Sequence, residues 1–119
     1  MIVDDERDMK DLFRQRFRKE IKQGEIEFSF VFSAEAALEY LNHHSEDYLA
    51  LIVTDINMPG MNGLELLRII KQTFGNLKVI MMTAYGDGQN YQTAIDYGAD
   101  GYIQKPIEFS SLKEKILNL

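Results

Sequence analysis

The chain has 119 residues, and 13 lysines and arginines against 19 aspartates and glutamates give it a formal net charge of −6. This length favours one domain over residues 1–119, with a core that needs no disulfide or structural metal. The acidic balance disfavours nucleic acid as a direct ligand, and the absence of cysteine excludes thiolate metal sites and thiol nucleophiles while permitting a reducing cytoplasm.

The first half of the chain alternates between apolar strands and amphipathic helices. Ile2 and Val3 end a first strand, and the acids that follow stand where a secretory leader would be basic and then apolar. Apolar residues at steps of three and four predict a helix over residues 7–21 that ends before Gly24. A strand over residues 26–32 and a helix over 34–42, capped by Ser33, come next.

The second half repeats this alternation. A buried strand is predicted over residues 49–54. The longest apolar run, residues 48–53, overlaps it and is far too short to cross a membrane. A loop over 58–63, an amphipathic helix and a strand over 77–82 follow. The loop over 84–90 leads into a short helix that stops at Gly98, and a strand over 102–104 precedes a terminal helix opened by a capping box at 111–114.

This order predicts an α/β fold, because five strands alternate with five helices and several strands are apolar without interruption. We expect a doubly wound, five-stranded parallel sheet of order 2-1-3-4-5, a flavodoxin-like three-layer sandwich. In such sheets ligands bind beyond the carboxyl ends of the strands, where the strand order reverses. The residues at the strand ends therefore predict the site.

Five chemically useful residues follow the predicted strands, and topology would bring them to one rim: Asp4, Asp5, Asp55, Thr83 and Lys105. Two like charges about 4 Å apart repel by about 4 kcal/mol at an effective dielectric of 20. A divalent cation would balance the three carboxylates, and an all-oxygen ligand set favours magnesium, calcium or manganese over zinc. A phosphoryl group is the natural co-ligand.

Each residue has an assigned part in this hypothesis. Asp55 would accept the phosphoryl group as an aspartyl phosphate, while Lys105 and Thr83 would contact its oxygens. Seen alone, the acidic pair fits a helix cap as well as it fits a metal site, and Asp55 alone favours a turn over a phosphoryl site. Their conjunction at one predicted rim favours the phosphoryl site.

The sequence resembles the response regulator receiver domains of two-component signalling. The resemblance runs nearly end to end and rests on four blocks: VDDE at residues 3–6, TDINMPGMNG at 54–63, MTA at 82–84 and GADGYIQKP at 98–106. It implies that Asp4, Asp5 and Asp55 hold Mg²⁺ together with the backbone carbonyl of Asn57. It also implies that Asp55 takes a phosphoryl group from a phosphohistidine, in contact with Lys105.

The resemblance further implies a switch and its modulators. Thr83 would move toward the new phosphate and Tyr102 would swing inward with it. Asn57 and Tyr85 would tune the lifetime of the phosphoryl bond, and the bond between Lys105 and Pro106 would be cis. The implied partners are a histidine kinase or phosphotransfer protein and a downstream effector domain or protein, with a phosphorylation-dependent homodimer left open.

The chain is thus expected to be a phosphoacceptor that catalyses only its own phosphorylation and dephosphorylation. Two alternatives stay open, an interaction module that is never phosphorylated and an aspartyl-phosphate phosphatase. A flavin mononucleotide carrier ranks last, because the acids after the first strand would repel its phosphate. The basic residues of the first helix are consistent both with a solvated face and with a docking surface for an acidic partner.

Overall fold

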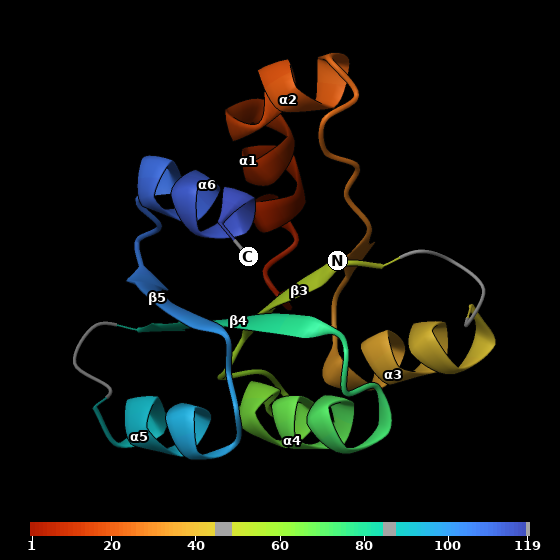
Figure 1. Cartoon of the computed structure of the whole chain (residues 1–119), viewed down its shortest axis with the longest axis vertical. Helices are drawn as coiled ribbons and strands as arrows, with labels where there is room; N and C mark the ends of the chain where they lie inside the picture. The colour runs from red at the N-terminus through yellow and green to blue at the C-terminus, as the bar shows by residue number, and fades with distance from the viewer. Residues whose placement is uncertain (45–48, 85–87, 119) are drawn as a thin grey trace.

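Five parallel strands form one sheet in the order β2-β1-β3-β4-β5 (Figure 1). The structure, a computed structural model, describes residues 1–44, 49–84 and 88–118. The strands are β1 (Ile2–Val3), β2 (Phe30–Val31), β3 (Leu51–Asp55), β4 (Lys78–Ala84) and β5 (Gly101–Lys105). The predicted strand order is confirmed, and the carboxyl ends of all five strands point to one edge.

Helices cover both faces of the sheet. The helices α1 (Asp8–Arg16), α2 (Arg18–Lys22) and α6 (Phe109–Leu117) lie on one side in Figure 1, and α3 (Ala34–His43), α4 (Gly63–Thr73) and α5 (Gly88–Asp96) lie on the other. The three-layer architecture is therefore confirmed. Among the described residues, every helix is too short or too polar to span a lipid bilayer.

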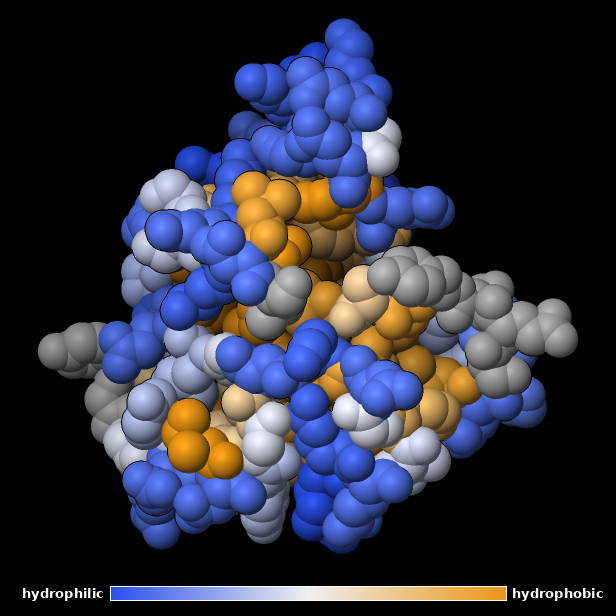
Figure 2. All heavy atoms as spheres, viewed as in Figure 1, coloured by the Kyte–Doolittle hydropathy of each residue, from blue (hydrophilic) through white to orange (hydrophobic). Residues whose placement is uncertain are grey.

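Two apolar cores follow from this arrangement, one on each face of the sheet. Val3, Ile52 and Met81 point into the core under α3, α4 and α5, whereas Ile2 and Val53 point into the core under α1 and α6. Successive residues of a strand alternate between faces, so strands buried on both sides must be apolar throughout. In Figure 2 apolar side chains are visible between the two helical layers.

Two predicted elements differ from the structure. The single helix expected over residues 7–21 is divided at Phe17, which leaves helical geometry at φ −104° and buries its ring completely among other phenylalanines. The described residues thus form six helices where five were predicted. The strand expected over 26–32 is confined to Phe30–Val31, because its neighbour β1 offers only two residues to pair with.

The helix caps show one correct and one wrong prediction. The Ser33 hydroxyl accepts a hydrogen bond from the Ala36 N–H at 3.0 Å and caps α3 as predicted. The capping box predicted at residues 111–114 is wrong, because α6 begins at Phe109 and its N-cap is Glu108. The Glu108 carboxylate accepts hydrogen bonds from the backbone N–H groups of Ser110 and Ser111, which places Ser111 inside the helix.

Candidate functional site

Lys105, the last residue of β5, contacts acidic side chains at the ends of two other strands. Its Nζ lies 2.8 Å from Asp4 Oδ2, just after β1, and 3.4 Å from Asp55 Oδ2, at the end of β3. Neighbouring parallel strands end at the same edge of the sheet, which brings together residues up to 101 positions apart in the sequence. The predicted convergence of Asp4, Asp55 and Lys105 is therefore present in the structure.

Three carboxylates crowd around this ammonium. One carboxylate oxygen from each of Asp4, Asp5 and Asp55 lies within 4.8 Å of the other two. Asp4 and Asp55 are buried, whereas Asp5 is exposed. The set is all oxygen, as magnesium, calcium and manganese prefer, and Asp5 is its solvent-exposed member. These residues fit a hard divalent cation.

Glu6 adds a fourth carboxylate that the sequence analysis did not assign to the site. Its Oε1 lies 3.9 Å from Lys105 Nζ, and its backbone N–H donates a hydrogen bond to Asp4 Oδ1 at 2.9 Å. Both oxygens of Asp4 are therefore engaged, one by this N–H and one by Lys105. The run of three acids after β1, Asp4 to Glu6, is the sequence feature from which Glu6 could have been predicted as part of the site.

Burial and charge act in opposite directions on the two groups that face each other here. Burial raises the pKa of the Asp55 carboxyl, the positive charge of Lys105 lowers it, and the charge of Asp4 raises it again, so that the pKa lies above 3.8. Burial alone would lower the pKa of the Lys105 ammonium, but its hydrogen bond to Asp4 and the surrounding negative charges outweigh burial and raise it. Lys105 therefore stays charged.

The backbone around Asp55 is held by the start of α4. The Gly63 N–H donates to the Ile56 carbonyl at 2.8 Å, and a Cβ added to Gly63 would lie 2.0 Å from the Asp55 carbonyl oxygen. Only a residue without a side chain allows this approach. Gly63 was predicted merely as part of a loop, and its role depends on a contact that no local pattern reports.

The loop after β3 is also tied to α3. The Met61 N–H donates to Glu35 Oε2 at 3.2 Å, so a carboxylate from the start of α3 holds the loop that contains Asn57. Asn57 is exposed in this loop, two residues beyond Asp55. Glu35 was not among the predicted residues.

The two predicted switch residues lie on adjacent strands and on one face of the sheet. Thr83 of β4 is completely buried and pairs in register with Gln104, while Tyr102 of β5 pairs with Met81. Register partners share a face, and that face is the one covered by α5, because Met81 belongs to its core. Tyr85 lies outside the described residues, so its predicted modulating position is not located. The Lys105–Pro106 peptide bond is cis, as the resemblance implies.

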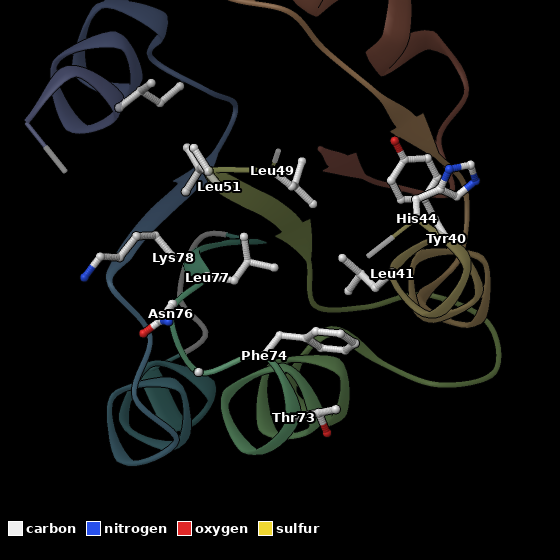
Figure 3. Close-up of a pocket in the computed structure, with 13 residues that line it drawn as sticks. Tyr40, Leu41, His44, Leu49, Leu51, Thr73, Phe74, Asn76, Leu77 and Lys78 are labelled. Atoms are coloured by element: carbon white, nitrogen blue, oxygen red, sulfur yellow. The ribbon is translucent and has the colours of Figure 1, made fainter. Parts of the chain in front are cut away.

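A large cavity lies away from this site. It measures about 710 Å³ and is lined by residues at the beginnings of β3 and β4, among them Leu49, Leu77 and Phe74, with the stacked rings of Tyr40 and His44 at one side (Figure 3). These strand beginnings lie at the opposite edge of the sheet from Asp55. The cavity is mainly apolar and does not contribute to the acidic site.

Comparison with known proteins identifies the family. The model of the response regulator receiver domain matches residues 1–117. The chain is 35% identical over 116 residues to the response regulator protein FleR of Pseudomonas aeruginosa, covering 98% of this chain but 23% of FleR. It is 30% identical over 116 residues to sporulation initiation phosphotransferase F of Bacillus subtilis, covering 98% of this chain and 88% of that protein.

Solved structures agree with this match. The structure titled FixJ-N is 31% identical, with a TM-score of 0.76, and covers 98% of this chain and 87% of that one. A response regulator receiver domain protein from Clostridium thermocellum is 26% identical, with a TM-score of 0.85 and coverage of 98% and 89%. Members of this family are signalling domains rather than conventional enzymes. The strand order, the acidic rim and the family match together establish that this chain belongs to the response regulator receiver domains of two-component systems.

Proposed function

We propose that the chain is a phosphoacceptor switch, with Asp55 as the residue that receives the phosphoryl group. One observation carries the proposal: Asp4, Asp5, Asp55 and Lys105 converge at the carboxyl edge of the sheet, with Lys105 Nζ 3.4 Å from Asp55 Oδ2. Lys105 is the central member of this group, and the acids surround its ammonium. A phosphoryl group on Asp55 would therefore meet a cation at once.

The proposed reaction is a transfer from a phosphohistidine. An oxygen of the ionised Asp55 attacks phosphorus, a phosphorus–oxygen bond forms, and the phosphorus–nitrogen bond of the donor breaks as its imidazole leaves. Lys105 holds its proton throughout, because the pKa of its ammonium is raised, and so it offers a permanent positive charge to the phosphoryl oxygens. Hydrolysis of the aspartyl phosphate by water later restores Asp55.

A magnesium ion is the proposed cofactor. Asp4, Asp5 and Asp55 would hold it with their carboxylates, and Asn57 with its backbone carbonyl. Bound Mg²⁺ would supply positive charge that neutralises the phosphoryl oxygens. Asp4 is fixed for this task by the Glu6 N–H and by Lys105, whereas exposed Asp5 leaves a side open to solvent.

The switch would run through Thr83 and Tyr102. A phosphoryl group brings roughly two negative charges and three acceptor oxygens, and the Thr83 hydroxyl can donate to one of them. Thr83 and Tyr102 share a sheet face on adjacent strands, so a shift of Thr83 changes the space beside Tyr102. We propose that this change alters the surface of β5 and α5. Asn57 and Tyr85 are proposed to modulate the lifetime of the phosphoryl bond.

The proposed partners follow from the family and from charge. A histidine kinase or phosphotransfer protein would supply the phosphoryl group in the cytoplasm, and an effector domain or protein would read the switched surface. The chain spans 23% of the length of FleR. That the effector is attached to this chain is therefore proposed from the family alone. The basic side chains of α1 and α2 offer a docking surface for an acidic donor.

Incubation with acetyl phosphate and magnesium tests the assignment. We expect the intact protein to gain the mass of one phosphoryl group, and the Asp55→Asn variant to gain none. Glu39→Gln, which neutralises an exposed carboxylate of α3, is the matched control and should be labelled like the wild type. Labelling of Asp55→Asn would contradict the assignment. An unlabelled wild type would favour the interaction module, and rapid turnover of an added phosphomonoester would favour a phosphatase.

A further inference from the structure

Tyr91 of α5 packs its ring against Tyr102, the proposed switch residue of β5. The ring centroids are 4.8 Å apart and the ring planes meet at 85°, so the edge of one ring meets the face of the other. Aromatic pairs favour this arrangement, which adds to the stabilisation from burial alone. The contact joins the helix to the strand directly.

The helix that carries Tyr91 is weakly anchored to the rest of the molecule. Among its described residues only Ala94 is fully buried, whereas α4 buries four. Tyr91 is 48% exposed and Ile95, one turn further on, is 46% exposed. Figure 2 shows a small hydrophobic cluster over α5 at the lower left, with hydrophilic residues around it. The ring contact is therefore one of the contacts that hold α5, beside buried Ala94, and a helix with so little buried surface can move at small cost.

We infer that Tyr91 is a positioning residue for the switch: its ring stabilises Tyr102 in the position seen here and transmits any displacement of Tyr102 to α5. The inference rests on the proposed function, because it requires Tyr102 to move. When Tyr102 leaves this position the contact between the rings is lost, so the contact favours the unphosphorylated state. Exposed Tyr91 and Ile95 then shift with the helix, which changes the surface that a partner meets.

The sign of the effect on ligand affinity follows from linkage. A ligand that binds only the switched state has an apparent affinity proportional to the population of that state. Removing a contact present only in the unswitched state raises that population. The usual strength of an aromatic pair corresponds to a change of about two- to tenfold. By reciprocity, the loss of Tyr91 should strengthen the binding of a phosphoryl mimic at Asp55 by the same factor.

Titration with beryllium fluoride and magnesium, a mimic of the phosphoryl group on Asp55, tests the inference. We expect Tyr91→Ala to bind the mimic about two- to tenfold more tightly than the wild type, with the backbone amide signals of Thr83 and Tyr102 shifted toward their bound positions before the mimic is added. Tyr91→Phe keeps the ring and should behave like the wild type. Ile95→Ala removes an equally exposed side chain of α5 and serves as the matched control.

The outcomes separate this inference from the proposed function. If the wild type binds the mimic and Tyr91→Ala binds it equally well while melting at a lower temperature, Tyr91 is merely structural and the inference is wrong. If the wild type neither binds the mimic nor accepts phosphate on Asp55, the proposed function fails and the inference fails with it. Tyr91→Leu, which keeps apolar volume without a ring, gives the same test should the alanine variant not fold.

Discussion

Asp55 is a buried carboxylate whose negative charge costs the folded chain free energy. Burial raises its pKa above the value of 3.8 for the free residue, and the attraction of Lys105 offsets this only in part because Asp4 repels it. A carboxyl group with a raised pKa in the folded state favours folding when protonated. Its ionisation therefore reduces stability as the pH rises through the folded-state pKa. A cation bound beside Asp55 would relieve this electrostatic destabilisation and so stabilise the folded chain.

Neutralising Asp55 should therefore stabilise the metal-free protein. We expect Asp55→Asn to have a higher free energy of unfolding than the wild type at pH 7. The difference should shrink as the pH falls, because the wild-type carboxyl takes up a proton more readily in the folded chain than in the unfolded one. Urea unfolding at several pH values between 4 and 7, with a chelator present, measures it. The exposed control Glu39→Gln should show no such trend, and a variant less stable than the wild type at pH 7 would contradict the argument.

The residues of the site were predictable to different degrees. Asp4, Asp5, Asp55 and Lys105 were found because each follows a strand, and the topology of a parallel sheet brings strand ends together. Glu35 could not be predicted in this way, because it lies at the start of α3 rather than at a strand end. Its carboxylate accepts a hydrogen bond from the Met61 N–H of the loop after β3. A contact of that kind depends on tertiary packing.

At the scale of elements, the end of β3 and the start of α4 are built as one unit. The Asn62 side chain caps α4 by accepting from the Glu65 N–H at 2.9 Å, and Gly63 places the first turn of the helix directly against the Asp55 carbonyl. The position of Asp55 therefore depends on how closely α4 can approach the strand.

Replacing Gly63 with alanine should break this unit. The added Cβ would lie 2.0 Å from a backbone oxygen, which cannot move away as a flexible side chain can. We expect Gly63→Ala to lose about 3 kcal/mol or more of stability and to accept phosphate from acetyl phosphate more slowly. Chemical unfolding and the labelling assay measure the two effects.

Gly75→Ala is the matched control for this substitution. A Cβ added to Gly75 would lie 3.6 Å from the Lys71 carbonyl oxygen, which is ordinary van der Waals contact. It should change stability and labelling little. Gly63→Ala with wild-type stability would show that α4 does not need this close approach.

The elements that sequence patterns predicted incompletely are those that depend on a partner. Residues 26–29 have strand-like composition, but β1 pairs only with Phe30 and Val31, so the strand ends where the ladder of hydrogen bonds ends. The predicted start of α6 is wrong because the Glu108 side chain accepts hydrogen bonds from the Ser110 and Ser111 N–H groups. These bonds start the helix at Phe109, before the predicted cap at Ser111. Local composition does not decide either outcome.

At the scale of the whole molecule, charge is distributed unevenly. The rim of the sheet gathers Asp4, Asp5, Glu6 and Asp55 around Lys105, whereas the last turns of α1 and α2 carry basic residues. A fold that collects like charges at one edge must be stabilised elsewhere, and here the two apolar cores supply that stabilisation. The excess negative charge at the rim is available to attract a cation.

Magnesium should therefore stabilise the entire fold through this one site. A ligand that binds only the folded state at about one hundred times its dissociation constant adds about 2.7 kcal/mol, which corresponds to a rise of about 10 °C in melting temperature for a domain of this size. We expect the wild type to show such a rise in differential scanning calorimetry, and Asp5→Asn to lose most of it.

Asp5 is exposed, so its replacement should leave the metal-free melting temperature nearly unchanged. Asp8→Asn, an exposed acid at the start of α1, should keep the full gain. An equal gain in Asp5→Asn would mean that magnesium binds elsewhere, because a site built from three carboxylates cannot lose one of them without losing affinity.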